Sequence, residues 1–297
     1  MISRSFIIAG VFFLIYSLVL QSNWVRDHLL TQSQWQGNLI RAQEYPFAPQ
    51  AGKNVVVGSS LMARLEPTSL SDDFYSLAFS GGGPLTGLEI VARSPNHPKL
   101  VLIETNLLME DISQTMLSNV YRPVFAHLRP HIPAFRERFQ PANVVVGSAL
   151  ERATQYGLAA LRRVAPNSAN VETGGGGSND TFFQNLLAEQ RHNMSKPPDS
   201  TKLGQRLEQL KSRVSELARA GTKVVFVEMP VDASLMELPY LATLREKMAR
   251  TFPETPFIRP VPGHTYRTDD ALHLSRQDAI DYASYLRGEL ARLHILP

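Results

Sequence analysis

The sequence contains no cysteine. This absence excludes disulfides, thiolate nucleophiles, Cys-ligated zinc, iron–sulfur clusters and the lipidated cysteine of a lipoprotein. It does not indicate a redox compartment, because a chain without thiols is compatible with any of them. A covalent intermediate in such a chain has to form on another side chain, and a serine hydroxyl is the candidate.

The chain also lacks an excess of charge. Its 30 basic and 27 acidic residues give a net charge of +3. No run of Lys and Arg and no basic stretch interleaved with aromatic residues is present, so we do not expect nucleic-acid binding. A hydrophobic content of 43% is enough for a core and excludes general disorder. The length of 297 residues fits two average domains, or one α/β domain with an insertion.

Charge is entirely absent from residues 5–24. Twenty helical residues span roughly 30 Å, the thickness of the hydrocarbon core of a bilayer. Arg4 precedes this segment, and Trp24 and Arg26 lie at its other end, as residues at a membrane interface do. We therefore expect residues 1–25 to form a transmembrane anchor. A cleaved signal peptide is the alternative, but no clear A-x-A cleavage site follows.

The positive N-terminus favours an anchor that starts in the cytoplasm. The rest of the chain would then lie in the periplasm of a bacterium, attached to the inner membrane by this single pass. We expect residues 26–52 to be a polar, partly helical connector and residues 53–297 to be the catalytic domain.

Short apolar runs alternate with amphipathic helical patterns along residues 53–297. This alternation predicts a parallel sheet covered by helices on both faces, because parallel neighbours need crossover connections. The predicted strands are Lys53–Val57, Phe74–Phe79, Lys99–Glu104, Thr222–Glu228 and Pro256–Pro260. The predicted helices are Leu85–Ala92, Thr201–Ala220, Ser234–Arg250 and Ser275–Leu293.

Residues 107–200 interrupt the alternation, and we expect a largely helical insertion there, as a lid or a partner surface. Helical patterns at Leu150–Val164 and Thr181–His192 lie on either side of a glycine-rich run, Thr173–Asn179. The run lacks the following G-K-[ST] of a P-loop, so we expect a surface loop.

Polar residues follow the predicted strands at their carboxyl ends, where open α/β folds bind ligands. Ser60 follows the first strand, after Gly58 and Ser59. The run Gly81–Gly83 follows the second strand, and glycines let backbone N–H groups approach a ligand closely. Asn106 follows the third strand and supplies an amide donor.

Asp270 and His273 precede the last predicted helix. A histidine three residues after an aspartate can have its ring oriented by that carboxylate. With Ser60 and the donors, the sequence supplies a nucleophile, a base and an orienting group. Asp269 is an alternative orienting residue, and His264 is an alternative base.

The order Ser, Gly, Asn and Asp-x-x-His resembles the SGNH (GDSL-like) hydrolase superfamily, over residues 53–106 and 222–295. The resemblance implies a flavodoxin-like three-layer αβα sandwich. It makes Ser60 the nucleophile, His273 the base and Asp270 its orienting partner. The oxyanion hole that it implies comprises the N–H of Ser60, the N–H of Gly81 (or Gly82) and the side-chain amide of Asn106.

The expected membrane anchor directs the resemblance to the membrane-tethered proteins of this superfamily. Membrane-tethered SGNH-like proteins include those that O-acetylate exopolysaccharides such as alginate or cellulose, beside a multispanning membrane-bound O-acyltransferase that delivers the acyl group. The resemblance thus implies an O-acyltransferase, most simply for acetyl, that works on an exopolysaccharide through an acyl-serine with such a partner.

Two alternatives remain open. One is a periplasmic esterase that deacetylates a carbohydrate or a lipid. The other is a catalytically inactive binding subunit, since Ser59 replaces the usual aspartate and Thr105-Asn106-Leu107 shortens the usual G-x-N-D block.

No residue pattern predicts a cofactor, and we expect no metal. His127 and His131 have the i, i+4 spacing of a zinc pair, but Pro130 opposes a helix there and the glutamate of H-E-x-x-H is missing. Glu228, at the end of the fourth predicted strand, is expected to line the acceptor pocket or to meet solvent.

Overall fold

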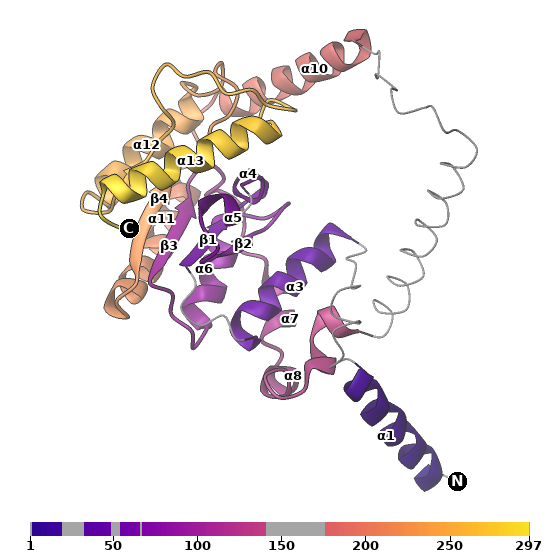
Figure 1. Cartoon of the computed structure of the whole chain (residues 1–297). Helices are drawn as coiled ribbons and strands as arrows, with labels where there is room; N and C mark the ends of the chain where they lie inside the picture. Colours follow the sequence, from indigo (N-terminus) through magenta and orange to yellow (C-terminus); the bar gives the residue numbers. More distant parts are fainter. Residues whose placement is uncertain (1, 20–32, 49–53, 66, 141–175, 297) are drawn as a thin grey trace. The chain divides into compact units, whose positions relative to one another are not determined.

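The structure is a computed structural model that describes residues 2–19, 33–48, 54–65, 67–140 and 176–296 (Figure 1). The chain divides into two compact units. Unit 1 comprises Met1–Ala48 and Ser118–Gly174, and unit 2 comprises Pro49–Leu117 and Gly175–Pro297.

Unit 2 is built on a five-stranded sheet in the order β2-β1-β3-β4-β5, in which every pairing is parallel. The predicted α/β class, parallel sheet and all five predicted strands are therefore confirmed. This strand order is the one found in flavodoxin-like folds. The strands are β1 (Asn54–Gly58), β2 (Phe74–Ala78), β3 (Leu100–Glu104), β4 (Lys223–Val227) and β5 (Phe257–Ile258).

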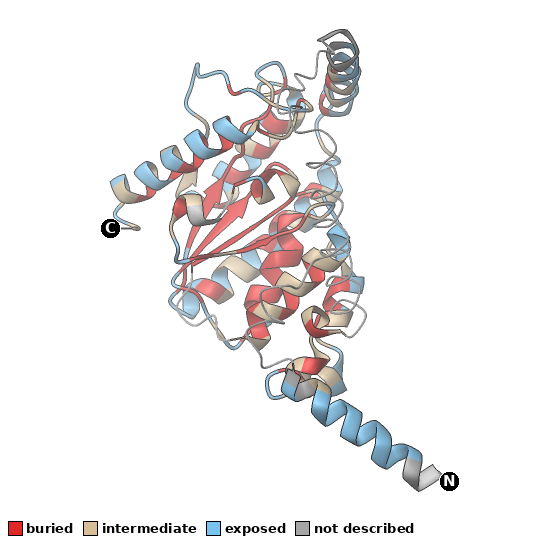
Figure 2. Cartoon of the chain, turned by 45° about the vertical axis from the view of Figure 1, so that its right-hand side comes forward, coloured by how far each residue is buried: buried red, intermediate tan, exposed pale blue. Residues whose placement is uncertain are grey.

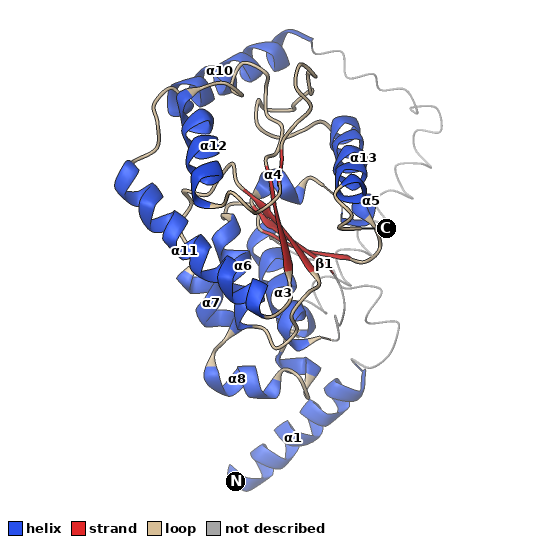
Figure 3. Cartoon of the chain, turned by 90° about the vertical axis from the view of Figure 1, so that its left-hand side faces the viewer, coloured by secondary structure: helices blue, strands red, loops and turns tan. Residues whose placement is uncertain are grey.

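The strands of this sheet are buried because helices cover both of its faces. Figure 3 shows α6, α11 and α12 on one face and α5 and α13 on the other. Figure 2 shows the central strands as buried, and every residue of β1 and of β3 is buried. The helices of unit 2 are α4 (Ser60–Ala63), α5 (Pro67–Leu70), α6 (Pro84–Arg93), α10 (Gly176–Met194), α11 (Ser200–Arg219), α12 (Pro239–Thr251) and α13 (Arg276–Arg292), with α7 (Gln114–Val120) at the boundary of the units.

Local sequence explains where these helices lie and which face each one buries. In α11, Leu203, Leu207, Leu210 and Leu217 are buried at the spacing of one helical face. The side chain of Asp199 caps this helix by accepting a hydrogen bond from the Lys202 N–H at 2.7 Å.

Two helix boundaries differ from the prediction. Helix α12 begins at Pro239 rather than at Ser234, and proline is favoured in the first turn, where its missing N–H needs no partner. Helix α10 begins at Gly176, so the expected surface loop at Thr173–Asn179 is wrong for its last four residues. Extending a formed helix by a residue needs no new nucleation, which lets α10 include these weak helix formers.

The remaining predictions for residues 107–200 have mixed outcomes. The predicted helix Thr181–His192 lies within α10 and is confirmed. The predicted helix Leu150–Val164 lies outside the described residues. The predicted insertion is not one piece, since its two ends belong to unit 2 and its middle to unit 1.

Unit 1 contains α1 (Ile2–Val19), α3 (Gln34–Phe47), α8 (Pro123–Leu128) and the 3-10 turns η1 (Pro133–Phe135) and η2 (Glu137–Phe139). Helix α3 gives the predicted connector its helical part. It packs against η2, where the side chain of Gln43 accepts a hydrogen bond from the Glu137 N–H at 2.7 Å. Helix α1 exposes large apolar side chains, such as Phe6 and Phe12. Among the described residues, no helix has the combined length and hydropathy of a membrane span.

Candidate active site

The predicted site residues of unit 2 follow the carboxyl ends of neighbouring strands. Ser59 follows β1 and caps α4, whose first residue is Ser60. Gly81 lies three residues beyond β2, and Asn106 lies two residues beyond β3. Because the strands are parallel, all these positions share one edge of the sheet, which we call the carboxyl edge.

Two hydrogen bonds join the serine, the histidine and the aspartate. The Oγ of Ser60 lies 2.7 Å from Nε2 of His273, and Nδ1 of the same ring lies 2.7 Å from Oδ2 of Asp270. Ser60 is partly exposed, and the His273 side chain keeps 21% of its exposure, so a substrate can reach both. This geometry lets the imidazole take the serine proton while the carboxylate holds its tautomer.

A tight turn holds Asp270 and His273 in this arrangement. The second carboxylate oxygen, Oδ1, accepts hydrogen bonds from the N–H of His273 at 2.8 Å and of Leu272 at 3.2 Å. Burial opposes ionisation of Asp270, but these bonds and the His273 ring outweigh it and hold the carboxyl pKa below its ordinary value. Ala271 has a φ of 70°, a left-handed conformation that is strained for alanine.

Asp269 and His264, the alternative orienting residue and the alternative base, make their contacts with residues other than Ser60. The carboxylate of Asp269 is 3.5 Å from the Arg64 guanidinium, and both side chains are exposed. His264 sits in a turn closed by its N–H on the Val261 carbonyl, and its ring packs against that of Tyr266 at 4.4 Å. The structure thus brings Asp270 and His273 to Ser60, rather than these alternatives.

Two glycines of the run after β2 differ in what their N–H groups do. The N–H of Gly82 donates to the Phe79 carbonyl at 3.0 Å, which closes a turn. Gly81 is exposed and has a φ of 75°, which glycine tolerates without strain. Gly81 is therefore the better candidate for an oxyanion donor, and Gly82 is committed to the turn.

Asn106 is buried and paired with the main chain of Met229, just beyond β4. Its Nδ2 donates to the Met229 carbonyl at 2.9 Å, and its Oδ1 accepts from the Met229 N–H at 2.7 Å. A primary amide carries two N–H donors, so one hydrogen of Nδ2 remains for a ligand. The oxyanion role of Asn106 stays a prediction, and the structure adds a tie between the ends of β3 and β4.

Glu104 is a residue of this site that the sequence analysis missed. It is fully buried at the end of β3 and accepts hydrogen bonds from the Ser59 N–H at 2.7 Å, the Ser59 hydroxyl at 2.8 Å and the Met62 N–H at 3.3 Å. Among the described residues no Lys, Arg or His lies within ion-pair distance of it. Burial raises its pKa, although the bonds from Ser59, Met62 and the Leu107 backbone act in the opposite direction.

The hydrogen bonds of Glu104 fix the turn that carries Ser60. A Cβ at Gly58 would lie 2.6 Å from Oε2 of Glu104 and 2.5 Å from Cβ of Met62, so only glycine fits between them. The available signal was one acidic residue that ends an otherwise apolar strand, Leu100–Glu104. We call the ends of β1, β2 and β3, with Ser60 and Glu104, the serine end of the carboxyl edge.

The ends of β4 and β5 form a second region, which we call the arginine end. Glu228 follows β4, is buried, and is held by Arg245 of α12 through two hydrogen bonds of 2.6 and 2.8 Å. Hydrogen bonding to Glu228 raises the pKa of the Arg245 guanidinium. Both residues line a cavity of about 330 Å³. Of the two outcomes left open for Glu228, the structure shows that it lines a cavity, and a role of that cavity in binding an acceptor stays a prediction.

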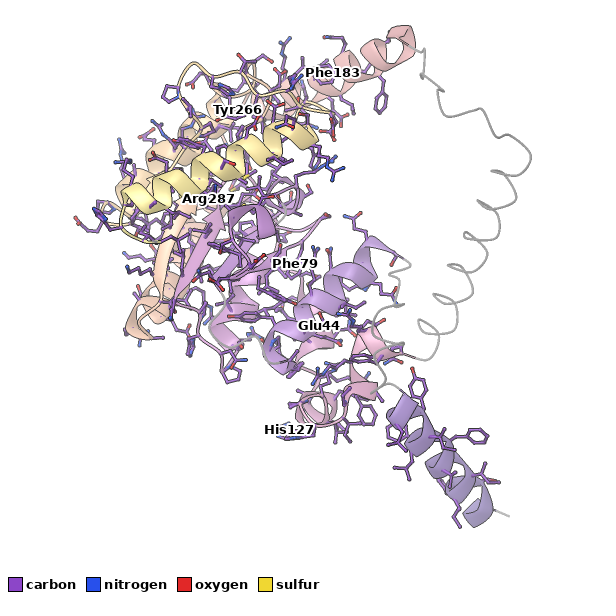
Figure 4. The ribbon with its side chains drawn as sticks, viewed as in Figure 1. Glu44, Phe79, His127, Phe183, Tyr266 and Arg287 are labelled. Atoms are coloured by element: carbon purple, nitrogen blue, oxygen red, sulfur yellow. The ribbon has the colours of Figure 1, made fainter. Side chains whose placement is uncertain are left out.

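The histidine pair in unit 1 offers little for a metal. Nδ1 of His127 lies 3.2 Å from the Pro123 carbonyl (His127 is labelled in Figure 4), and α8 ends at Leu128, before Pro130. Pro130 therefore stands outside the helix, as predicted. Among the described residues no group of three His, Asp or Glu side chains could hold a metal ion.

Comparison with known proteins does not identify a family for this chain. No protein-family model matches the chain, and no curated protein is significantly similar to it.

Proposed function

We propose that the chain is a serine-dependent O-acyltransferase that moves an acyl group, most simply acetyl, onto an exopolysaccharide. The observation that supports it best is the linked pair of 2.7 Å contacts from Ser60 to His273 and from His273 to Asp270. A binding subunit without turnover has no need of this arrangement. The resemblance to the SGNH hydrolase superfamily, with its flavodoxin-like αβα sandwich, is part of the proposal.

In the first half-reaction, Ser60 Oγ attacks the acyl carbonyl while His273 Nε2 takes the serine proton. The imidazolium formed is stabilised by Asp270, and N–H donors stabilise the oxyanion. The donor's oxygen then leaves with the proton from His273, and an acyl-serine remains. In the second half, His273 takes the proton of a sugar hydroxyl as its oxygen attacks the acyl-serine. The bond between the acyl carbon and Ser60 Oγ then breaks, and His273 returns the proton to Ser60 Oγ.

The proposed membrane anchor favours acyl transfer over hydrolysis. The uncharged residues 5–24 support an anchor at residues 1–25 that holds the catalytic domain in the periplasm, at the bacterial inner membrane. A tethered enzyme can receive acyl groups from a multispanning O-acyltransferase in the same membrane, whereas a secreted esterase needs no tether. The esterase is the second candidate, because Ser60 and His273 are accessible to water as well as to a glycan.

The test uses Ser60→Ala, with Ser284→Ala as a matched control on the exposed side of α13. Wild-type protein and the control should react with a fluorophosphonate probe, and Ser60→Ala should not, with its melting temperature unchanged. In cells, Ser60→Ala should abolish acylation of the exopolysaccharide. Unchanged acyl content with Ser60→Ala would contradict the proposal. Steady hydrolysis of acetylated sugars, without transfer to added glycan, would favour the esterase.

A further inference from the structure

The cavity at the arginine end has no role in the chemistry of Ser60, yet it is joined to that site by the backbone. Met229, just after Glu228, is paired with Asn106. The N–H of Asp232 donates to the carbonyl of Ala271, between Asp270 and His273, at 2.8 Å. The loop that forms one wall of the cavity therefore also supports the serine end.

Two arginines, Arg245 and Arg259, line this cavity together with two glutamates, Glu228 and Glu237. The Arg245 side chain is 14% exposed and is fixed by Glu228, but its Nη1 makes only long contacts of 3.4 Å with Glu237, which is 87% exposed. Arg259 follows β5 and also lines the cavity. In the described part of the chain, no carboxylate lies within ion-pair distance of Arg259. Among the described residues, the cavity is thus lined by one guanidinium without a carboxylate partner, that of Arg259, and by a second, that of Arg245, whose Nη1 is held only by the 3.4 Å contacts with Glu237.

The position of Glu237 indicates what kind of anion fits. A carboxylate already sits at Nη1 of Arg245, loosely and from the solvent side. A ligand carboxylate could take its place and reach Arg259 as well, and guanidinium groups bind carboxylates in a fixed fork geometry.

Part of the cavity lining is apolar or aromatic. It contains Pro260, Val261, Pro262 and Tyr266, and Figure 4 shows Tyr266 beside α13. Apolar walls with a few placed polar groups are typical of sites for small organic ligands. Such a wall suits the C–H face of a sugar ring, which lacks charge.

We propose that this cavity binds a carboxylate-bearing sugar residue of the acceptor polymer. The inference rests on the proposed function and deepens it, because it makes the acceptor an acidic glycan. The end of β5 is three strand spacings from the end of β1, or about 14 Å. The bound residue is therefore not adjacent to the one whose hydroxyl is acylated but lies further along the same polymer, and the cavity fixes the register of the polymer on Ser60.

The experiment measures binding by calorimetry on the full chain in detergent, with Ser60→Ala as the background so that no turnover occurs. The ligands are an oligouronate, a neutral cello-oligosaccharide of equal length and an oligomeric glycerol phosphate. Arg259→Gln is added to this background, and Arg287→Gln is the control. Arg287 is an exposed arginine of α13 (Figure 4) that does not line the cavity.

We expect the oligouronate to bind more tightly than the neutral oligosaccharide, with an affinity that falls as salt is added. Arg259→Gln should weaken that binding about tenfold or more, since it removes a charged hydrogen bond. Arg287→Gln should leave it unchanged. Equal binding of neutral and acidic ligands, or no effect of Arg259→Gln, would overturn the proposal. Arg259-dependent binding of the glycerol phosphate but not of the oligouronate would overturn it in favour of a phosphate site.

Labelling of Ser60 separates this failure from failure of the proposed function. The fluorophosphonate probe is applied to chains that retain Ser60, with and without Arg259→Gln. If Ser60 is labelled but acidic sugars do not bind through Arg259, the inference about the cavity fails and the proposed acyltransferase function still stands. If Ser60 is not labelled but Arg259-dependent binding occurs, the enzyme proposal fails and the acidic-sugar site stands.

Discussion

Two buried glutamates at neighbouring strand ends are stabilised in different ways. Glu104 ends β3 at the serine end and is surrounded by neutral donors: the N–H and hydroxyl of Ser59 and the N–H of Met62. Glu228 follows β4 at the arginine end and is held by the guanidinium of Arg245. The exposed fractions are nearly equal, 0% for Glu104 and 2% for Glu228, so burial does not explain the difference.

The different partners of Glu104 and Glu228 indicate what each carboxylate does. The N–H donors to Glu104 are backbone groups, so Glu104 fixes the course of the chain at the turn that carries Ser60, and among the described residues it does so without an arginine or lysine beside it. The ion pair of Glu228 fixes a side chain instead, and Nη1 of Arg245, a residue that lines the cavity, makes only the 3.4 Å contacts with the exposed Glu237. On the function proposed above, one end of the edge would position the reacting serine, and the other would bind a charged group of the ligand.

The largest expected effect separates the histidines of the two ends. His273→Ala should slow the reaction of Ser60 with the fluorophosphonate probe about 10⁴- to 10⁶-fold, because the serine loses its base. His264→Ala, at the arginine end, should leave the labelling rate unchanged. Comparable losses in both variants would break the division of the edge into two ends.

The next largest effect is a loss of stability when the ion pair between Glu228 and Arg245 is broken. Arg245→Leu should lower the free energy of unfolding by about 3–5 kcal/mol, because it leaves Glu228 buried without a partner. The double variant Glu228→Leu/Arg245→Leu should recover most of this loss, since neither charge remains. Denaturant unfolding measures both. If the double variant is as unstable as Arg245→Leu, Glu228 does not depend on Arg245.

A smaller loss of stability is expected at the serine end, together with a change in reactivity. Glu104→Gln replaces an acceptor oxygen with an NH₂ group that faces N–H donors, and should cost about 1–3 kcal/mol. It should also slow labelling of Ser60, because the turn shifts. Glu89→Gln is the control: Glu89 is a buried glutamate of α6 paired with Arg213, and its loss should lower stability without slowing labelling. Equal labelling rates of Ser60 in the two variants would show that Glu104 does not position Ser60.

The smallest effect is a pH dependence of stability. Burial raises the pKa of Glu104 in the folded state above its value of about 4.3 in an unfolded chain. The folded state therefore binds more protons in this window, and the free energy of unfolding should fall as pH rises from about 4.3 through the raised pKa. Glu104→Gln should flatten this slope, and an unchanged slope would show that Glu104 does not titrate there.

Other groups near this window act separately. Burial raises the pKa of Tyr240 of α12 to about 12, and the charges of Glu110 and Glu104 act in the same direction, so Tyr240 stays protonated. Asp270 has a lowered pKa, so its contribution is complete above about 3.9 and is lost as pH falls through its folded pKa. Its slope has the opposite sign and lies at lower pH.

Much of unit 2 could be predicted from local patterns. The apolar runs around Val55–Val57 and Leu100–Ile103 have the composition of buried parallel strands, and each predicted strand is present. The position of Ser60 just beyond a strand, and of Asp270 three residues before His273, placed those residues near one edge. The acidic end of an apolar strand was a signal for Glu104, but its role could not be predicted, because its partners, two backbone N–H groups and the Ser59 hydroxyl, meet it only in the folded chain.

The sequence by itself determined the class of fold and the residue types available for chemistry, because strand and helix periodicities and strand-end residues are local properties. Only the tertiary structure decided which residues meet. It brought His273 rather than His264 to Ser60, paired Asp269 with Arg64 rather than with the imidazole, and turned Glu104 toward Ser59. These choices depend on loops that return from distant parts of the chain, and the hydrogen bonds that fix them form only when those parts are packed together.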